Sequence, residues 1–104
     1  MIQLLKNLLG LQSGVKMQNL VKNGAQIIDV RTPGEFQSGH IRGSLNIPLQ
    51  DLMQNFSKIK MDKPIRTCCA SGMRSASAKN ILKASGYGEV YNGGGWHSLQ
   101  QKIR

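Results

Sequence analysis

The sequence predicts an α/β fold, with a small, mainly parallel central sheet and helices on both faces. Three observations favour it. Strand-like and helix-like segments alternate along the chain, glycines and prolines separate them, and a cysteine-containing turn joins a strand to a helix. Alternation of this kind implies right-handed crossovers between parallel strands, which place helices on both faces of the sheet. Ligands bind beyond the carboxyl ends of such strands, so a site is expected there.

The chain has 104 residues, which suits one small domain with a modest core. Residues 1–14 are expected to form an N-terminal helical extension, because residues 2–9 carry apolar side chains at helical spacing. The main domain is expected to span residues 15–104. It begins with a short edge strand at residues 15–16 and a short amphipathic helix at residues 17–22.

The central strands are expected where β-branched and apolar residues follow one another. These segments are residues 25–30, 44–47, 65–68 and 89–91. The intervening segments favour a Pro-Gly turn with at most one helical turn, followed by three helices, at residues 32–36, 49–56, 75–85 and 96–103. Gly86 is a typical helix stop, and the triple glycine at residues 93–95 is expected to turn the chain into the last helix.

The composition is strongly basic, with a net charge of +9 from 14 Lys and Arg against 5 Asp and Glu. This balance favours solubility and attracts anionic small molecules. The basic residues are scattered and are not interleaved with aromatic residues, so nucleic-acid binding is not expected. The sequence shows neither a membrane-spanning apolar stretch nor a signal peptide, so a cytoplasmic location with free thiols is expected. No metal site is expected, because the adjacent cysteines lack further ligands at metal spacing.

The run from Cys69 to Ser75 is the strongest candidate for a functional site. It follows a strand and leads into a helix, so Cys69 lies on a tight turn at a helix N-terminus. The helix dipole and the unpaired amides of the first turn favour an anion there. Arg74 adds a positive charge nearby, and both effects lower the pKa of a thiol. The sequence therefore predicts a reactive thiolate.

The chain resembles the single-domain rhodaneses, which are sulfurtransferase modules, over residues 15–103. The resemblance depends on a series of short motifs in a fixed order: Asp29-Val30-Arg31, Glu35-Phe36, Gly39-His40-Ile41, Gly43-Ser44, Asn46-Ile47-Pro48, Cys69-x-x-Gly72-x-Arg74-Ser75, Gly86-Tyr87 and Gly94-Gly95. Each motif alone is weak, and together they are specific. The resemblance implies that residues 15–104 form a rhodanese-like domain.

The resemblance also implies a mechanism. The Cys69 thiolate attacks the outer sulfur of a donor such as thiosulfate, sulfite leaves, and a cysteine persulfide remains for an acceptor thiol or cyanide. Arg74 would hold the anionic donor, and the rest of the loop would bind substrate, namely Ala70, Ser71, Gly72, Met73 and Ser75. The implied partners are a small anionic sulfur donor, a thiol acceptor and a sulfur-relay protein, without any cofactor.

One departure from the family limits the choice of substrate. Rhodaneses tuned for thiosulfate often carry basic residues just after the cysteine, whereas Ala70 and Ser71 are neutral. We therefore expect modest affinity for thiosulfate, and a protein persulfide is an alternative donor.

Four residues are expected to support the site. Asp29 would tie down neighbouring loops by accepting backbone hydrogen bonds, and Arg31 would pair with Glu35. His40 is a candidate general base, because histidine is the side chain most often used in that role. In a Gly-His-Ile turn we favour a structural role for His40, in which a hydrogen bond holds the loop.

Two other functions remain open from the sequence. Counted from Cys68, the run to Arg74 has the Cys-x5-Arg spacing of cysteine phosphatases of the same fold, although Thr67 stands where those enzymes usually have histidine. A non-enzymatic sulfur carrier or regulatory module is the second alternative. In the favoured interpretation Cys68 points into the core, and a resolving thiol is its alternative role.

Overall fold

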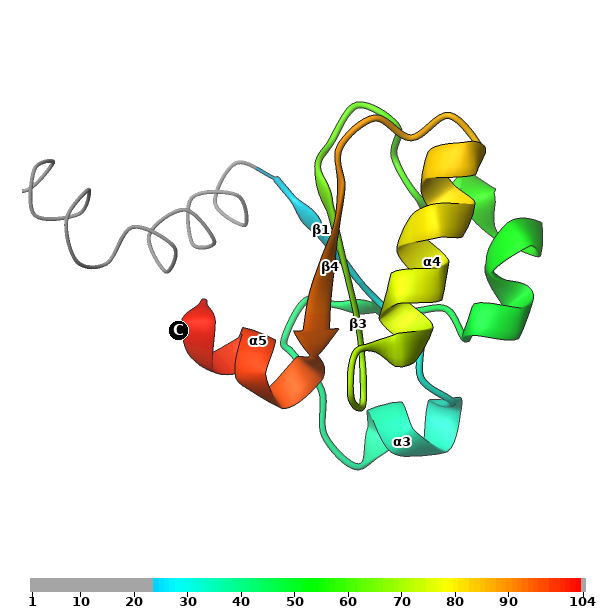
Figure 1. The fold of residues 1–104 in the computed structure, drawn as a ribbon. Coiled ribbons are helices and arrows are strands. Elements are labelled where there is room, and N and C mark those ends of the chain that lie inside the picture. The colour runs from blue at the N-terminus through cyan, green and yellow to red at the C-terminus, as the bar shows by residue number, and fades with distance from the viewer. Residues whose placement is uncertain (1–23, 104) are drawn as a thin grey trace, which may run out of the picture.

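The computed structural model describes residues 24–103, which surround a four-stranded sheet with strand order β2-β1-β3-β4 (Figure 1). Every neighbouring pair of strands is parallel. The strands are β1 (Gln26–Asp29), β2 (Leu45–Asn46), β3 (Ile65–Cys69) and β4 (Val90–Gly95). The mainly parallel sheet predicted from the sequence is therefore confirmed, and the four strands overlap the expected segments, although β4 extends beyond residue 91 to Gly95.

Three α-helices and two 3-10 helices complete this part of the chain. They are α3 (Pro33–Gln37), η1 (Leu49–Gln54), η2 (Phe56–Lys58), α4 (Met73–Ala84) and α5 (Trp96–Lys102). The turn expected at residues 32–36 is a complete short helix. Thr32 caps it and forms a reciprocal capping box with Glu35, which explains how so short a helix is held.

The α-helix expected at residues 49–56 is wrong in type, because η1 and η2 occupy this region. The backbone bonds here span three residues, as between Asn55 N and Leu52 O at 3.0 Å. Leu49, Leu52 and Phe56 still contact the core, with Leu52 fully buried. Apolar spacing of three to four residues fits either helix type, so the pattern did not distinguish them.

The core has two parts, one on each face of the sheet, because successive strand residues point to opposite faces. Ile28 and Cys69 belong to the larger part, which α4 and η1 cover. Ile27 and Cys68 belong to the smaller part with Leu99 of α5. Figure 1 shows α4 and α5 on opposite sides of the strands, as the sequence predicts for this fold.

The triple glycine is not the turn that the sequence suggested, because β4 runs through Gly95 before α5 begins. Its glycines allow a close approach between strands. A Cβ atom at Gly93 would lie 2.6 Å from the carbonyl oxygen of Thr67 and 2.8 Å from Cδ2 of Leu99. The strand pairing of β3 with β4 is irregular between Thr67 and Cys69, which brings Gly95 opposite Cys69.

The expected extension at residues 1–14, the edge strand at residues 15–16 and the helix at residues 17–22 lie outside the described residues. Between residues 24 and 103, no helix has the length and apolar character needed to cross a membrane.

Candidate functional site

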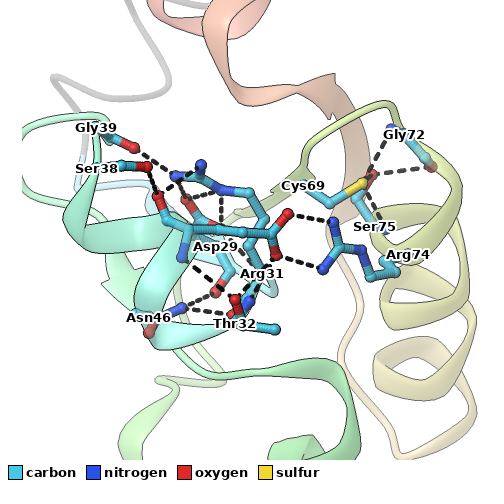
Figure 2. Close-up of polar contacts among 11 residues, drawn as sticks. Asp29, Arg31, Thr32, Ser38, Gly39, Asn46, Cys69, Gly72, Arg74 and Ser75 are labelled. Carbon is cyan, nitrogen blue, oxygen red and sulfur yellow. Dashed lines mark hydrogen bonds and ion pairs between the residues drawn. The ribbon is translucent and has the colours of Figure 1, made fainter.

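The candidate nucleophile, Cys69, is the last residue of β3, at the carboxyl end of the sheet (Figure 2). Residues 70–72 connect it to α4. The backbone N–H groups of Gly72 and Ser75 donate to Sγ of Cys69 at 2.9 and 3.4 Å. Gly72 has a φ of 111°, a left-handed conformation that glycine adopts without steric cost, and this conformation starts α4. The loop thus aims its amides at the sulfur.

The environment of Cys69 lowers the pKa of its thiol. Burial acts against the thiolate, but hydrogen bonds from the Ser75 side chain and from the amides of Ser75, Gly72 and Ser71 outweigh it. These groups lie in the first turn of α4 and in the loop before it, where unpaired N–H groups favour an anion. The loop therefore favours the ionised form of Cys69 although the residue is only 1% exposed.

Arg74 binds Glu35 and not the sulfur. Its guanidinium donates to the two carboxylate oxygens of Glu35 at 2.7 and 3.0 Å, and Figure 2 shows Arg74 beside Cys69. Arg74 and the backbone of Thr32 lower the pKa of Glu35 to about 2. The pair is partly exposed. It joins α3 to α4 and neutralises the only full positive charge in the cysteine loop.

The expected ion pair between Arg31 and Glu35 is wrong, because Arg31 pairs with Asp29. Nε and Nη2 of Arg31 donate to the Asp29 carboxylate, with the shortest contact at 2.7 Å, and both residues are buried. Arg31 reaches Glu35 only through the backbone carbonyl, at 3.1 Å, and it also donates to Gly39 O at 2.7 Å. The buried Asp29 carboxylate, two positions away, is the stronger partner for Arg31. The Glu35 carboxylate is therefore free to pair with Arg74.

The Asp29 carboxylate also accepts the backbone N–H of Arg31 at 3.0 Å. The Arg31 guanidinium lies 4.7 Å from the centre of the Trp96 ring, over which it is stacked. These contacts join the end of β1, the loop after α3 and the start of α5 behind the cysteine loop. Asp29 and Arg31 thus connect three segments of the chain through their side chains.

His40 contacts the loop that carries it. Its Nδ1 atom lies 2.7 Å from the carbonyl oxygen of Phe36, and its ring stacks on the Phe36 ring at 3.7 Å between centroids. The contact fits the structural role expected for this residue.

The outer rim of the loop is uncharged. Ala70 and Ser71 are exposed, and Met73 is 80% exposed at the first turn of α4. A Cβ atom at Gly95 would lie 3.0 Å from the carbonyl oxygen of Ala70, so β4 supports the loop from beneath. The rim of the loop therefore presents neutral side chains and one arginine, Arg74, that is already paired with Glu35.

Cys68 lies on the opposite face of the sheet from Cys69. It is fully buried among Ile27, Ile41 and Leu99, and burial followed by the nearby Asp29 charge raises the pKa of its thiol to about 12. A protonated thiol sealed beneath α5 cannot act as the nucleophile of a Cys-x5-Arg phosphatase. The same placement argues against a resolving thiol.

Sequence reasoning missed Asn92. Its Oδ1 atom accepts the hydroxyl of Ser75 at 2.6 Å, so β4 contributes a polar side chain to the cysteine loop. The only signal in the sequence was its position just before the triple glycine. In the part of the chain from residue 24 to 103, no group of three or more Cys, His, Asp or Glu could hold a metal ion.

The fold and this loop define a class of protein: a parallel α/β domain whose third strand ends in a cysteine that accepts hydrogen bonds from backbone N–H groups at the start of the following helix. The particular family follows from comparison with known sequences, because the family model of the rhodanese-like domain matches residues 14–102. The chain belongs to the rhodanese-like family.

Curated relatives agree with this assignment. The chain is 44% identical over 81 residues to the uncharacterized protein YqhL of Bacillus subtilis, covering 77% of this chain and 64% of that protein. It is 39% identical over 70 residues to the thiosulfate sulfurtransferase PspE of Escherichia coli, covering 65% of this chain and 67% of that protein. The chain thus spans less than two thirds of the Bacillus protein. PspE is named as a thiosulfate sulfurtransferase.

Solved structures show the same fold. A rhodanese-related protein from Thermoplasma volcanium has a TM-score of 0.72 at 31% identity, covering 86% of this chain and 88% of its own. A rhodanese with anions from E. coli has a TM-score of 0.66 at 33% identity, covering 70% of this chain and 88% of its own.

Proposed function

We propose that this chain is a sulfurtransferase that carries sulfane sulfur as a persulfide on Cys69. The observation that supports this most directly is the set of donors around Sγ, in which the Gly72 amide lies at 2.9 Å and the Ser75 amide at 3.4 Å. Such donors favour an anionic sulfur, and the thiolate is the form of cysteine that attacks. Membership of the rhodanese-like family supports the same function.

The proposed reaction has two steps. In the first, the Cys69 thiolate attacks the outer sulfur of thiosulfate, a bond forms between Sγ and that sulfur, and the original sulfur–sulfur bond breaks. Sulfite leaves with the bonding electron pair, so the total charge is conserved without an added proton or oxidant. In the second, a thiolate or cyanide attacks the terminal sulfur, and Cys69 leaves as a thiolate. We expect ping-pong kinetics.

The polar environment limits which donors suit the site. Thiosulfate is a dianion, and the nearest guanidinium, that of Arg74, is already paired with the Glu35 carboxylate. Ala70 and Ser71 on the rim add no charge. These features favour a donor whose sulfane sulfur is bonded to a thiol sulfur, as in a protein persulfide, and they support slow turnover with thiosulfate. A sulfur carrier that is loaded by another protein is therefore the second candidate function.

Intact mass measurement tests the persulfide. Incubation with thiosulfate or a low-molecular-weight persulfide should add one sulfur atom to the protein, because the donors of the loop lower the pKa of the Cys69 thiol. Cys69→Ser should abolish the gain. Cys68→Ala is the matched control and should keep it, because Cys68 is sealed on the other face.

A gain of sulfur on Cys69→Ser, or its loss on Cys68→Ala alone, would contradict the assignment. Steady-state assays with thiosulfate and cyanide then separate the two candidates. Multiple turnovers show an enzyme for small donors, and a single loading without turnover shows a carrier.

A further inference from the structure

The Asn92 side chain makes three hydrogen bonds, two of which join β4 to the cysteine loop. Its Oδ1 atom accepts the Ser75 hydroxyl at 2.6 Å and the Gly94 amide at 2.9 Å, and its Nδ2 donates to the carbonyl oxygen of Gly72 at 3.3 Å. Asn92 and Ser75 are 17 positions apart in sequence. The side chain does not contact the sulfur, so any effect on Cys69 passes through Ser75 or Gly72.

The orientation of the Asn92 amide is fixed by its partners. The Gly94 N–H is a donor and requires an acceptor opposite it, which only Oδ1 provides. The reversed amide would set the NH2 group against this donor and leave the Gly72 carbonyl facing an oxygen. Oδ1 is therefore held toward Ser75 as an acceptor whatever the ionisation state of Cys69.

Ser75 has a single hydroxyl proton and three acceptors within reach. Its Oγ lies 2.6 Å from Asn92 Oδ1, 3.0 Å from Gly72 O and 3.5 Å from Sγ of Cys69. The shortest contact directs the proton to Asn92 when Cys69 is a thiol, and the thiol then donates to Oγ. When Cys69 ionises, the thiolate must compete with Asn92 for the same proton.

We propose that Asn92 is a positioning residue that withdraws the Ser75 hydroxyl from Cys69 and so limits how strongly the loop stabilises the thiolate. The proposal deepens the sulfur-transfer function proposed above. A persulfide carrier uses Cys69 as nucleophile in one step and as leaving group in the next. Nucleophilicity falls and leaving-group ability rises as the pKa of a thiol falls, so a thiol with an intermediate pKa serves both steps.

The other ionisable groups around Cys69 come from five elements. They are Arg74 on α4, Glu35 on α3, Asp29 and the neighbouring Arg31 at the end of β1, Cys68 on β3, and Tyr91 on β4. Among residues 24–103, none of these ionisable side chains forms a hydrogen bond with the Asn92 side chain. A change at Asn92 therefore acts on Cys69 chiefly through Ser75.

The test is a titration of Cys69 by the ultraviolet absorbance of its thiolate, in the full chain carrying Cys68→Ala. Asn92→Ala should lower the pKa of Cys69 by roughly half a unit to one unit, the size expected for one redirected hydrogen bond. Asn92→Asp should raise it, because a carboxylate is a stronger acceptor and adds negative charge. A structural loosening of the loop would raise the pKa in both variants.

Two controls isolate the pathway. Asn80→Ala and Asn80→Asp make the same changes on the exposed surface of α4, and both should leave the pKa unchanged. In a Ser75→Ala background, which itself should raise the pKa, Asn92→Ala should have no further effect.

The proposal is overturned if Asn92→Ala raises or does not change the pKa of Cys69, or if its lowering persists without Ser75. Asn92→Asp keeps the side-chain size, so an unchanged pKa in that variant alone also overturns it. The titration reports the thiol whether or not sulfur is transferred. Failure of the persulfide to form in the mass measurement is thus a separate result, which contradicts the function and not the hydrogen-bond competition.

Discussion

The ion pair of Glu35 with Arg74 decides how much positive charge the site offers to a donor. Its carboxylate remains ionised through the neutral range, because the pKa of Glu35 is lowered to about 2. The two side chains are 35% and 37% exposed, so water screens the pair and its contribution to stability is at most about 1 kcal/mol. An ion pair this weak can be broken by substitution without loss of the fold.

Glu35→Gln should therefore improve the use of thiosulfate. Removing the carboxylate charge frees the Arg74 guanidinium for the dianion, and we expect kcat/KM for thiosulfate to rise about two- to fivefold. Steady-state kinetics measure it.

Glu89→Gln is the matched control, since Glu89 precedes β4 at the opposite end of the sheet. It should leave kcat/KM unchanged. An equal rise in both variants, or a fall with Glu35→Gln, would show that the pair does not restrain Arg74.

Side-chain partners were the least predictable feature of the site. Cys69, Gly72 and Ser75 lie within seven positions, and their place between a strand and a helix predicted the donor loop. Glu35 and Arg74 are 39 positions apart, and their contact depends on how α3 lies against α4. Glu35 was expected to pair with Arg31, and the buried Asp29 was the better partner for that arginine.

Among the elements, β4 shows most clearly how sequence pattern and packing differ. Three glycines in a row are typical of a turn, yet here they belong to a strand. Glycine is needed in this strand because β4 lies so close to β3 and α5 that a side chain would not fit. The absence of side chains was visible in the sequence. The close approach that requires it was not, because that distance depends on strands far apart in the chain.

Gly93→Ala should destabilise the protein by about 1–3 kcal/mol, since its Cβ atom would overlap the Thr67 carbonyl and the Leu99 side chain. Denaturant unfolding measures the loss. Gly88→Ala is the control, because no atom lies within 4 Å of the point that its Cβ atom would occupy. Equal stability of the two variants would mean that β4 can move away from β3 at little cost.

The strands and the two longer helices were predictable because alternating apolar segments and glycine boundaries specify them locally. The helix type at residues 49–56 was not, since three-residue and four-residue apolar spacings coincide over so short a segment. Strand alternation places neighbouring residues on opposite faces of the sheet. The structure confirms this for Ile27 and Ile28, and for Cys68 and Cys69.

Over the whole molecule, the net charge of +9 should act at long range on anionic donors. We expect the rate of sulfur loading from thiosulfate to fall as salt is raised from about 0.01 to 0.5 M, because the ions shorten the screening length. Loading from an uncharged trisulfide should stay constant, and the two rates can be followed by mass. Equal salt dependence for both donors would show that the charge plays no part in capture.

The separation of the two adjacent cysteines by the sheet has a consequence for how a loaded sulfur is stored. Were both thiols on one face, Cys68 could attack Sγ of the Cys69 persulfide, form a disulfide and expel hydrosulfide into solution. The sheet and the Leu99 side chain block that internal discharge. Under the proposed function, a sulfur atom on Cys69 would therefore stay bound until an outside acceptor reaches the rim of the loop.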